Sequence, residues 1–333
     1  MGDKDSVTKE YMKQPDRFAD LFNGFCYGGE QRIQPGDLRD MDTASIVLPY
    51  GSAGAALPEQ KARDVLKRAL KTDGRVAYCI LGVENQSKIH LAMPVRNMLY
   101  DAMTLTEQVA ATASSHKKAH EHGRDEAEYL SGFHRDDKIL PVITIVVYWG
   151  AEAWDAPTTL REMYPEGIDE SVLRYANDYK VNLVAPAMMT DQQLDIFKSD
   201  LKDVLKFIKH SVSKSELAQL VNSNKAYKSL DRLAAQTISV CAGLNFNLPV
   251  GEERIDMCKA IDDMLTDARN EGIDKGRNEG IDKGRSEATN EGMLNVIAMA
   301  RDYNLGKEAA VQQLAKRYPL SQDDAMSFVN QNW

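Results

Sequence analysis

The sequence lacks the features that mark membrane and secreted proteins. No apolar run approaches the ~18–20 residues of a membrane-spanning helix, and the polar start Met1-Gly-Asp-Lys-Asp-Ser6 has no secretory hydrophobic region. The four cysteines are scattered, without a Cys-x-x-Cys pair or a zinc-ligand spacing. We therefore expect a cytoplasmic protein with buried thiols and no membrane partner.

Positive charge is also scarce, because 41 lysines and arginines face 50 acidic residues and leave a net charge of −9. Nonspecific DNA affinity comes largely from cations that neutralise phosphates. The negative net charge therefore argues against a protein that binds DNA over its whole surface. Any basic surface must be local. Residues 61–75 carry six cations against two acids, a balance of +4: Lys61, Arg63, Lys67, Arg68, Lys71 and Arg75 against Asp64 and Asp73.

The sequence is otherwise that of a globular α/β protein, with 43% hydrophobic and 27% charged residues in 333. Hydrophobic patterns predict helices over 16–27 and 93–113 and buried strands over 76–86 and 142–149. Residues 61–70 are ambiguous, because their composition favours a helix. Helices between buried strands predict a mixed α/β sandwich. Beyond residue 190 the pattern turns helical, starting with the capping box Thr190-Asp-Gln-Gln193.

One apolar run carries the chemistry. Tyr78-Cys-Ile-Leu-Gly-Val-Glu-Asn-Gln-Ser-Lys88 places Glu84, Gln86 and Lys88 at alternate positions, which share one face of an extended strand. A hairpin through Asp73-Gly74 would bring Asp64 beside them, giving the two carboxylates that a hard divalent cation needs for phosphodiester hydrolysis. The alternative is a strand-end glutamate followed by a solvated loop.

Several motifs in their joint order resemble one family. Arg63-Asp64-Val65, Leu81-Gly-Val-Glu-Asn-Gln-Ser87 and Ala92-Met-Pro-Val-Arg-Asn-Met-Leu-Tyr-Asp101 are similar to the recombination-promoting nuclease (Rpn)/putative transposase family of the PD-(D/E)XK superfamily. Further similarity extends over roughly residues 11–292. The resemblance implies a restriction-endonuclease-like mixed sheet flanked by helices, and it requires a strand over 61–70.

The resemblance also implies roles for single residues. Asp64 takes the place of the first acid of the motif, although Arg63 stands where a proline is usual, and Glu84 takes the place of the second metal ligand for Mg²⁺, with Mn²⁺ able to substitute. Gln86 stands where the superfamily usually has lysine, and an amide supplies no positive charge. Lys88 is the candidate electrostatic helper.

Arg96 and Tyr100 lie four residues apart, on one face of the predicted helix. Together with Arg63 they are the candidate DNA contacts, the alternative for the helical pair being an ordinary exposed face. Asp20 or Glu30 would add a carboxylate, but either is equally consistent with a cap or a surface charge.

Four parts are expected along the chain: a nuclease-like core over 11–189, a helical annex over 190–270, an octapeptide repeat over 271–292, and a small helical module over 293–333. In the repeat, Glu271-Gly-Ile-Asp-Lys-Gly-Arg-Asn278 recurs as Glu279-Gly-Ile-Asp-Lys-Gly-Arg-Ser286. It places glycine every four positions, which leaves a helix and a flexible linker both open. The C-terminal helices are candidates for forming a homo-oligomer.

His116, His120 and His122 form a histidine cluster in a polar stretch, and we interpret it as a flexible linker rather than a metal site. The function predicted for the whole chain is a metal-dependent DNA endonuclease. The alternative is a nucleic-acid-binding or assembly protein on the same fold that has lost catalysis.

Overall fold

The computed structural model describes residues 3–42, 44–46, 60–62, 64–70, 77–244, 246 and 248–333. It divides the chain into two compact units, Met1–Ile261 and Asp262–Trp333. Within the described residues, no helix combines the length and the apolarity needed to cross a membrane.

The first unit is built on a five-stranded mixed sheet in the order β1-β4-β5-β6-β7. Neighbours are antiparallel from β1 to β5 and parallel from β5 to β7. The strands are β1 (Leu38–Asp40), β4 (Val65–Leu70), β5 (Ala77–Gln86), β6 (Val142–Tyr148) and β7 (Asn182–Val184). Two small ladders pair β2 (Ala44–Ile46) with β3 (Gln60–Ala62) and β8 (Leu230–Asp231) with β9 (Arg254–Ile255).

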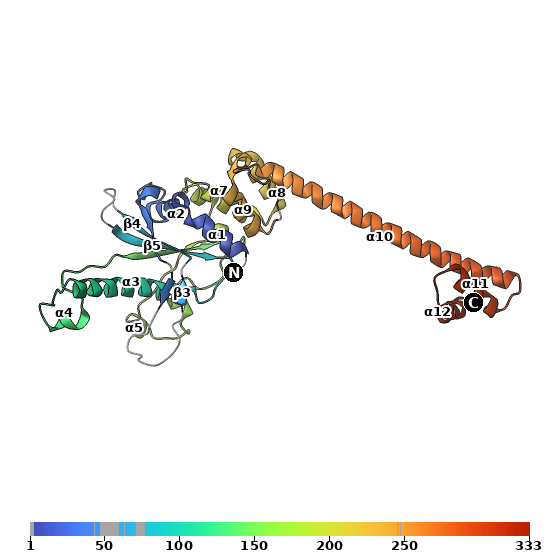
Figure 1. The fold of residues 1–333 in the computed structure, drawn as a ribbon, viewed down its shortest axis with the longest axis horizontal. Coiled ribbons are helices and arrows are strands. Elements are labelled where there is room, and N and C mark those ends of the chain that lie inside the picture. The colour runs from blue at the N-terminus through green and yellow to red at the C-terminus, as the bar shows by residue number, and fades with distance from the viewer. Residues whose placement is uncertain are drawn as a thin grey trace. The chain divides into compact units, whose positions relative to one another are not determined.

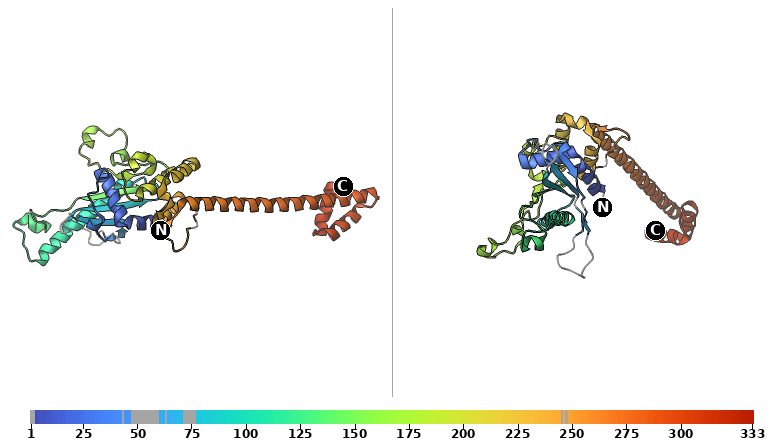
Figure 2. Two further views of the ribbon diagram at one scale, coloured as in Figure 1. Left: turned by 90° about the horizontal axis from the view of Figure 1, so that it is seen from above. Right: turned by 60° about the vertical axis from the view of Figure 1, so that its left-hand side comes forward.

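Helices lie on both faces of this sheet, with α1 and α2 on one side and α3 on the other (Figures 1 and 2). The α-helices of the first unit are α1 (Asp3–Lys13), α2 (Pro15–Tyr27), α3 (Met93–Lys118), α4 (Glu126–Ser131), α5 (Glu170–Leu173), α6 (Asp191–Leu194), α7 (Leu201–His210), α8 (Lys214–Ser223) and α9 (Arg232–Ala242). The mixed α/β fold predicted from the sequence is confirmed. The segment 61–70, which composition alone favours as helix, contributes to β3 and β4, because pairing with β5 overrides local propensity.

The two faces of the sheet are buried in different cores. Leu81 and Val83 of β5 belong to the large core that includes Phe18 of α2. On the opposite face, Val146 of β6 packs with Met93 of α3. This division follows from the two-residue alternation of side chains along each strand.

The helices after residue 190 share the large core with the sheet. Val204 and Phe207 of α7 and Ile238 of α9 pack in the same hydrophobic cluster as Leu81 and the side chains of α1 and α2. No boundary between compact units lies at 189/190, because the apolar stripes of these helices are buried in the same core as the sheet.

The capping box at Thr190 is present at the start of α6. The helical pattern that begins there is interrupted after Leu194, however, and resumes as α7 at Leu201. At the interruption, the buried carboxylate of Asp20 accepts hydrogen bonds from the backbone N–H groups of Lys198 and Ser199 at 2.9 and 2.7 Å. A side chain of α2 thus satisfies backbone donors that a continuous helix would satisfy itself.

The second unit is helical. Most of α10 (Met257–Asp302) belongs to it, together with α11 (Lys307–Arg317) and α12 (Gln322–Asn332). Ile297, Leu314 and Val329 form the centre of its hydrophobic core. The octapeptide repeat of residues 271–292 lies wholly inside α10, so the helix is the form that the structure gives to this segment.

Candidate functional site

Strand β5 places Glu84 and Gln86 on the sheet face covered by α3. In the parallel ladder, Glu84 is aligned with Val146 and Gln86 with Tyr148. Aligned residues of neighbouring strands point to the same face, and both β6 residues pack with Met93 of α3. Glu84 is 0% exposed and Gln86 is buried beside it. The carboxylate and the amide therefore share one buried face, as the sequence alternation predicts.

Lys88 does not join them. Strand β5 ends at Gln86, and Lys88 lies in an exposed bend two residues later. The Ser87 hydroxyl donates a hydrogen bond of 2.8 Å to Asp5 of α1, which ties the chain to that helix. The expectation that Lys88 shares the face of Glu84 is wrong, because it required the strand to continue beyond Gln86.

Asp64 reaches the same end of the sheet from the neighbouring strand. It directly precedes β4, whose first residue, Val65, is paired with Val83 of β5. One further step of this antiparallel register places Asp64 beside Glu84. The Asp64 carboxylate also accepts a hydrogen bond of 2.7 Å from the backbone N–H of Asn85. Two acids twenty positions apart in the sequence are thus brought to one place by strand pairing.

Arg96 of α3 links the two acids. Its guanidinium contacts a Glu84 carboxylate oxygen at 3.4 Å and lies 5.6 Å from the ring centroid of Tyr100, so both predicted helix residues face the site. Burial opposes the charge on Arg96, but Glu84, Tyr100 and Asp64 outweigh it and raise the pKa of this guanidinium. Both acids therefore stabilise the charged form of Arg96.

The electrostatics of Asp64 fit a cation-binding role. Burial raises the pKa of Asp64 above its usual value, although the Asn85 N–H and the charges of Lys9 and Arg96 lower it. The groups around this carboxylate therefore compensate its ionised form incompletely. A divalent cation bound to oxygen ligands would complete that compensation, so Asp64 and Glu84 form a chemically suitable pair of ligands.

Asp64 borders an open cavity of about 360 Å³. Lys9 and Lys13, one helical turn apart on α1, line it together with Asp40 and Asp42. The sequence reasoning missed these two lysines. Their i, i+4 spacing is visible in the sequence, but nothing local indicates that α1 lies against this end of the sheet.

Other predicted residues lie outside this arrangement. Glu30 is exposed and pairs with Arg32 at 2.8 Å, and Asp20 is used at the start of α7, so neither adds a ligand. Arg63 and the turn at Asp73-Gly74 lie outside the described residues. In the basic stretch 61–75, Lys67 is buried in an ion pair with Asp40 and does not face solvent.

A family model described as "Putative transposase, YhgA-like" matches residues 55–237. The match includes Asp64, strand β5 with Glu84 and Gln86, and helix α3 with Arg96. No curated protein and no solved structure matches the chain.

Proposed function

Because this chain belongs to the putative transposase family of YhgA-like proteins, we propose that it is a metal-dependent DNA endonuclease that hydrolyses phosphodiester bonds. One observation carries the proposal: Asp64 and Glu84 come from adjacent strands and both interact with Arg96, with the Gln86 amide on the same face as Glu84. A fully buried acid and a half-buried acid at the end of paired strands are more readily explained by a ligand than by stability.

In the proposed mechanism, Asp64 and Glu84 hold Mg²⁺, for which Mn²⁺ can substitute. When held there, such an ion would supply positive charge for the scissile phosphate and would make a nearby water a better nucleophile. Gln86 orients the attacking water, since its amide both donates and accepts hydrogen bonds. Asn85 keeps Asp64 in position through the 2.7 Å backbone hydrogen bond.

In the PD-(D/E)XK superfamily, a lysine on the strand usually supplies positive charge to the site. In this chain, that charge comes from α1 and α3. Lys9 acts on Asp64 from α1, and Arg96 acts on both acids from α3. The contact of Arg96 with Glu84 is long, at 3.4 Å, and the Arg96 side chain is 33% exposed. On metal binding, Arg96 can therefore leave Glu84 and turn toward a phosphate oxygen.

DNA is the proposed substrate, and its route to the metal follows the open cavity beside Asp64. Lys9 and Lys13 border that cavity, but Asp40, Asp42 and Asp64 border it as well, so the two lysines offset only part of its negative charge. Because so few cations surround the site, binding should be weak and should depend only shallowly on salt, since the salt dependence grows with the number of phosphates neutralised.

The test is nicking of supercoiled plasmid by the full-length chain with Mg²⁺ or Mn²⁺. Asp64→Asn and Glu84→Gln each retain side-chain shape, and we expect either to lower the rate by about 100-fold or more, since each removes a charged metal ligand. Glu30→Gln, which removes an exposed acid outside the site, is the matched control. Residual activity that is unchanged in both site variants would show that cleavage comes from a contaminant.

A second function has support of its own. Gln86 replaces the usual lysine, and Glu84 is fully buried beneath Arg96, which suits a protein that binds nucleic acid or assembles without cutting. This alternative predicts that DNA is retarded in a gel shift equally by wild-type protein and Glu84→Gln, with no metal-dependent nicking by either.

A further inference from the structure

A second cluster of metal-ligating side chains lies at the far end of α3, among residues 116–137. A cavity of about 590 Å³ there is lined by four histidines, His116, His120, His122 and His134. The whole chain has only six histidines. The expectation of a flexible linker is wrong for His116, because α3 continues to Lys118 and holds that side chain on its last turn.

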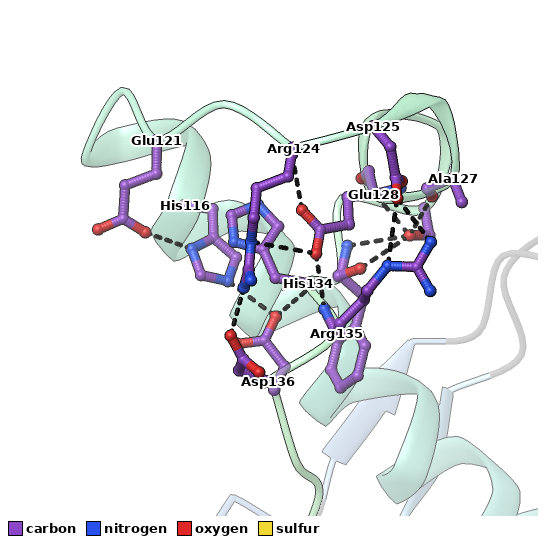
Figure 3. A network of polar contacts seen from close by, with 12 residues as sticks. His116, Glu121, Arg124, Asp125, Ala127, Glu128, His134, Arg135 and Asp136 are labelled. Atoms are coloured by element: carbon purple, nitrogen blue, oxygen red, sulfur yellow. Dashed lines mark hydrogen bonds and ion pairs between the residues drawn. The ribbon is translucent and has the colours of Figure 1, made fainter.

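His116 lies between Glu121 and His134 in the network shown in Figure 3. Its Nε2 lies 2.8 Å from a carboxylate oxygen of Asp137, and its Nδ1 lies 2.5 Å from Glu121. The ring of His134 is stacked on it, with centroids 3.8 Å apart and planes at 19°. One ligand atom from each of His116, His134 and Asp137 falls within 4.8 Å of the other two.

The surroundings of His116 differ from those of His210 by the stacked imidazole ring. His210 also lies between two carboxylates, at 3.0 Å from Glu216 and 3.1 Å from Asp191, which is an ordinary ion-pair arrangement. Only the His116 cluster adds a second, parallel imidazole. The second ring and the carboxylate of Asp137 bring three possible metal-ligating side chains together, whereas the ring nitrogens of His210 face two carboxylates.

We propose that His116, His134 and Asp137 bind a divalent transition metal ion, with Zn²⁺ as the best fit. Two imidazole nitrogens and one carboxylate oxygen are a donor set typical of zinc, whereas Mg²⁺ prefers oxygen alone. Bonds of about 2.0–2.2 Å in tetrahedral geometry place ligand atoms about 3.3 Å apart. Small rotations of these half-buried side chains would reach that spacing.

The surroundings are already arranged for such a site. Glu121 would accept a hydrogen bond from Nδ1 of His116 while Nε2 binds the metal, which is how carboxylates commonly orient metal-bound histidines. The buried carboxylate of Glu128 holds the loop by accepting backbone N–H groups of Arg124 and Arg135 at 2.7 and 2.9 Å. The metal would then fasten the end of α3 to the loop that follows α4, and its fourth position would face the cavity.

The test is a Co²⁺ titration of the full-length chain carrying Asp64→Asn and Glu84→Gln, so that the proposed nuclease site does not contribute. We expect one equivalent to produce the intense visible absorption of tetrahedral Co²⁺ and Zn²⁺ to displace it. His134→Phe keeps the stacked ring but removes both nitrogens, and should weaken binding by about tenfold or more, as should Asp137→Asn.

His210→Asn is the control, since it removes a histidine with two carboxylate neighbours outside the cluster. Retained binding in this control together with loss in His134→Phe would support the site. The proposal fails if the parent chain shows no saturable Co²⁺ binding, if His134→Phe binds as well as the parent, or if His210→Asn loses binding equally. Circular dichroism of each variant, which should match the parent, ensures that the comparison is made on folded protein.

Discussion

Two clusters in the first unit each combine one arginine with two acids, yet they differ in how tightly the charges are held. Arg17 of α2 donates to Asp200 with two nitrogens, at 2.9 and 2.8 Å, and to Asp231 at 2.6 Å. The Arg17 side chain is only 7% exposed. Arg96, by contrast, contacts Glu84 at 3.4 Å and is 33% exposed.

The pKa values of the acids differ in direction as well. Burial raises the pKa of Asp231, but the hydrogen bond and charge of Arg17 outweigh it, so the pKa ends below the usual value. For Asp64 the opposite holds, because burial outweighs Asn85, Lys9 and Arg96. In the cluster of Arg17, Asp200 and Asp231, the charges are paired at short distances. This cluster joins α2 to the helices after residue 190. The second cluster is incompletely compensated, which is typical of a site arranged for a ligand.

The largest difference between the two clusters is expected when each arginine is removed in turn. Arg17→Met should lower the free energy of unfolding by about 3–5 kcal/mol, because two acids are left without their buried partner. Arg96→Met should cost less, about 1–2 kcal/mol, because its contact with the buried Glu84 is long and Arg96 itself is 33% exposed. Urea denaturation of the metal-free variants measures both. Equal losses would mean that the two clusters serve the same structural purpose.

A smaller effect is expected from Gln86→Lys, which restores the usual cation beside Glu84. One favourable charge near the scissile phosphate is worth about 1.4 kcal/mol, or tenfold in rate, so plasmid nicking should increase by up to about tenfold. Gln86→Met, which has similar length and no charge, is the control. A rate equal to that of wild type would show that Lys9 and Arg96 already supply the necessary charge.

The smallest expected effect is on the stability of the folded chain at acid pH. It concerns only the cluster of Arg17, Asp200 and Asp231. Asp231 has a lowered pKa in the folded chain, so its stabilising contribution is present above the ordinary aspartate value of about 3.9 and disappears as pH falls through the lower folded value. Asp231→Asn keeps the cap on α9 but should weaken this dependence. Urea midpoints measured from pH 7 down to pH 2.5 should fall more steeply for wild type than for the variant.

Local patterns in the sequence were sufficient for much of the fold. The alternation along β5 placed Glu84 and Gln86 on one face, the capping box marked the start of α6, and the apolar periodicity gave α3. Such features depend on residues a few positions apart, whose relative directions are fixed by strand or helix geometry. The same reasoning failed at Lys88, where the hydrogen bond of Ser87 to α1 accompanies the end of the strand.

Which side chains are available to the candidate site, and which of them share a face through strand alternation, follows from the sequence alone. Their partners depend on the packing of whole elements: Asp64 lies beside Glu84 through the β4–β5 register, Lys9 comes from α1, and His134 stacks on His116. These contacts join segments distant along the chain, and they depend on how whole elements pack. No local propensity encodes that packing, because it is set by the burial of apolar faces across the entire unit.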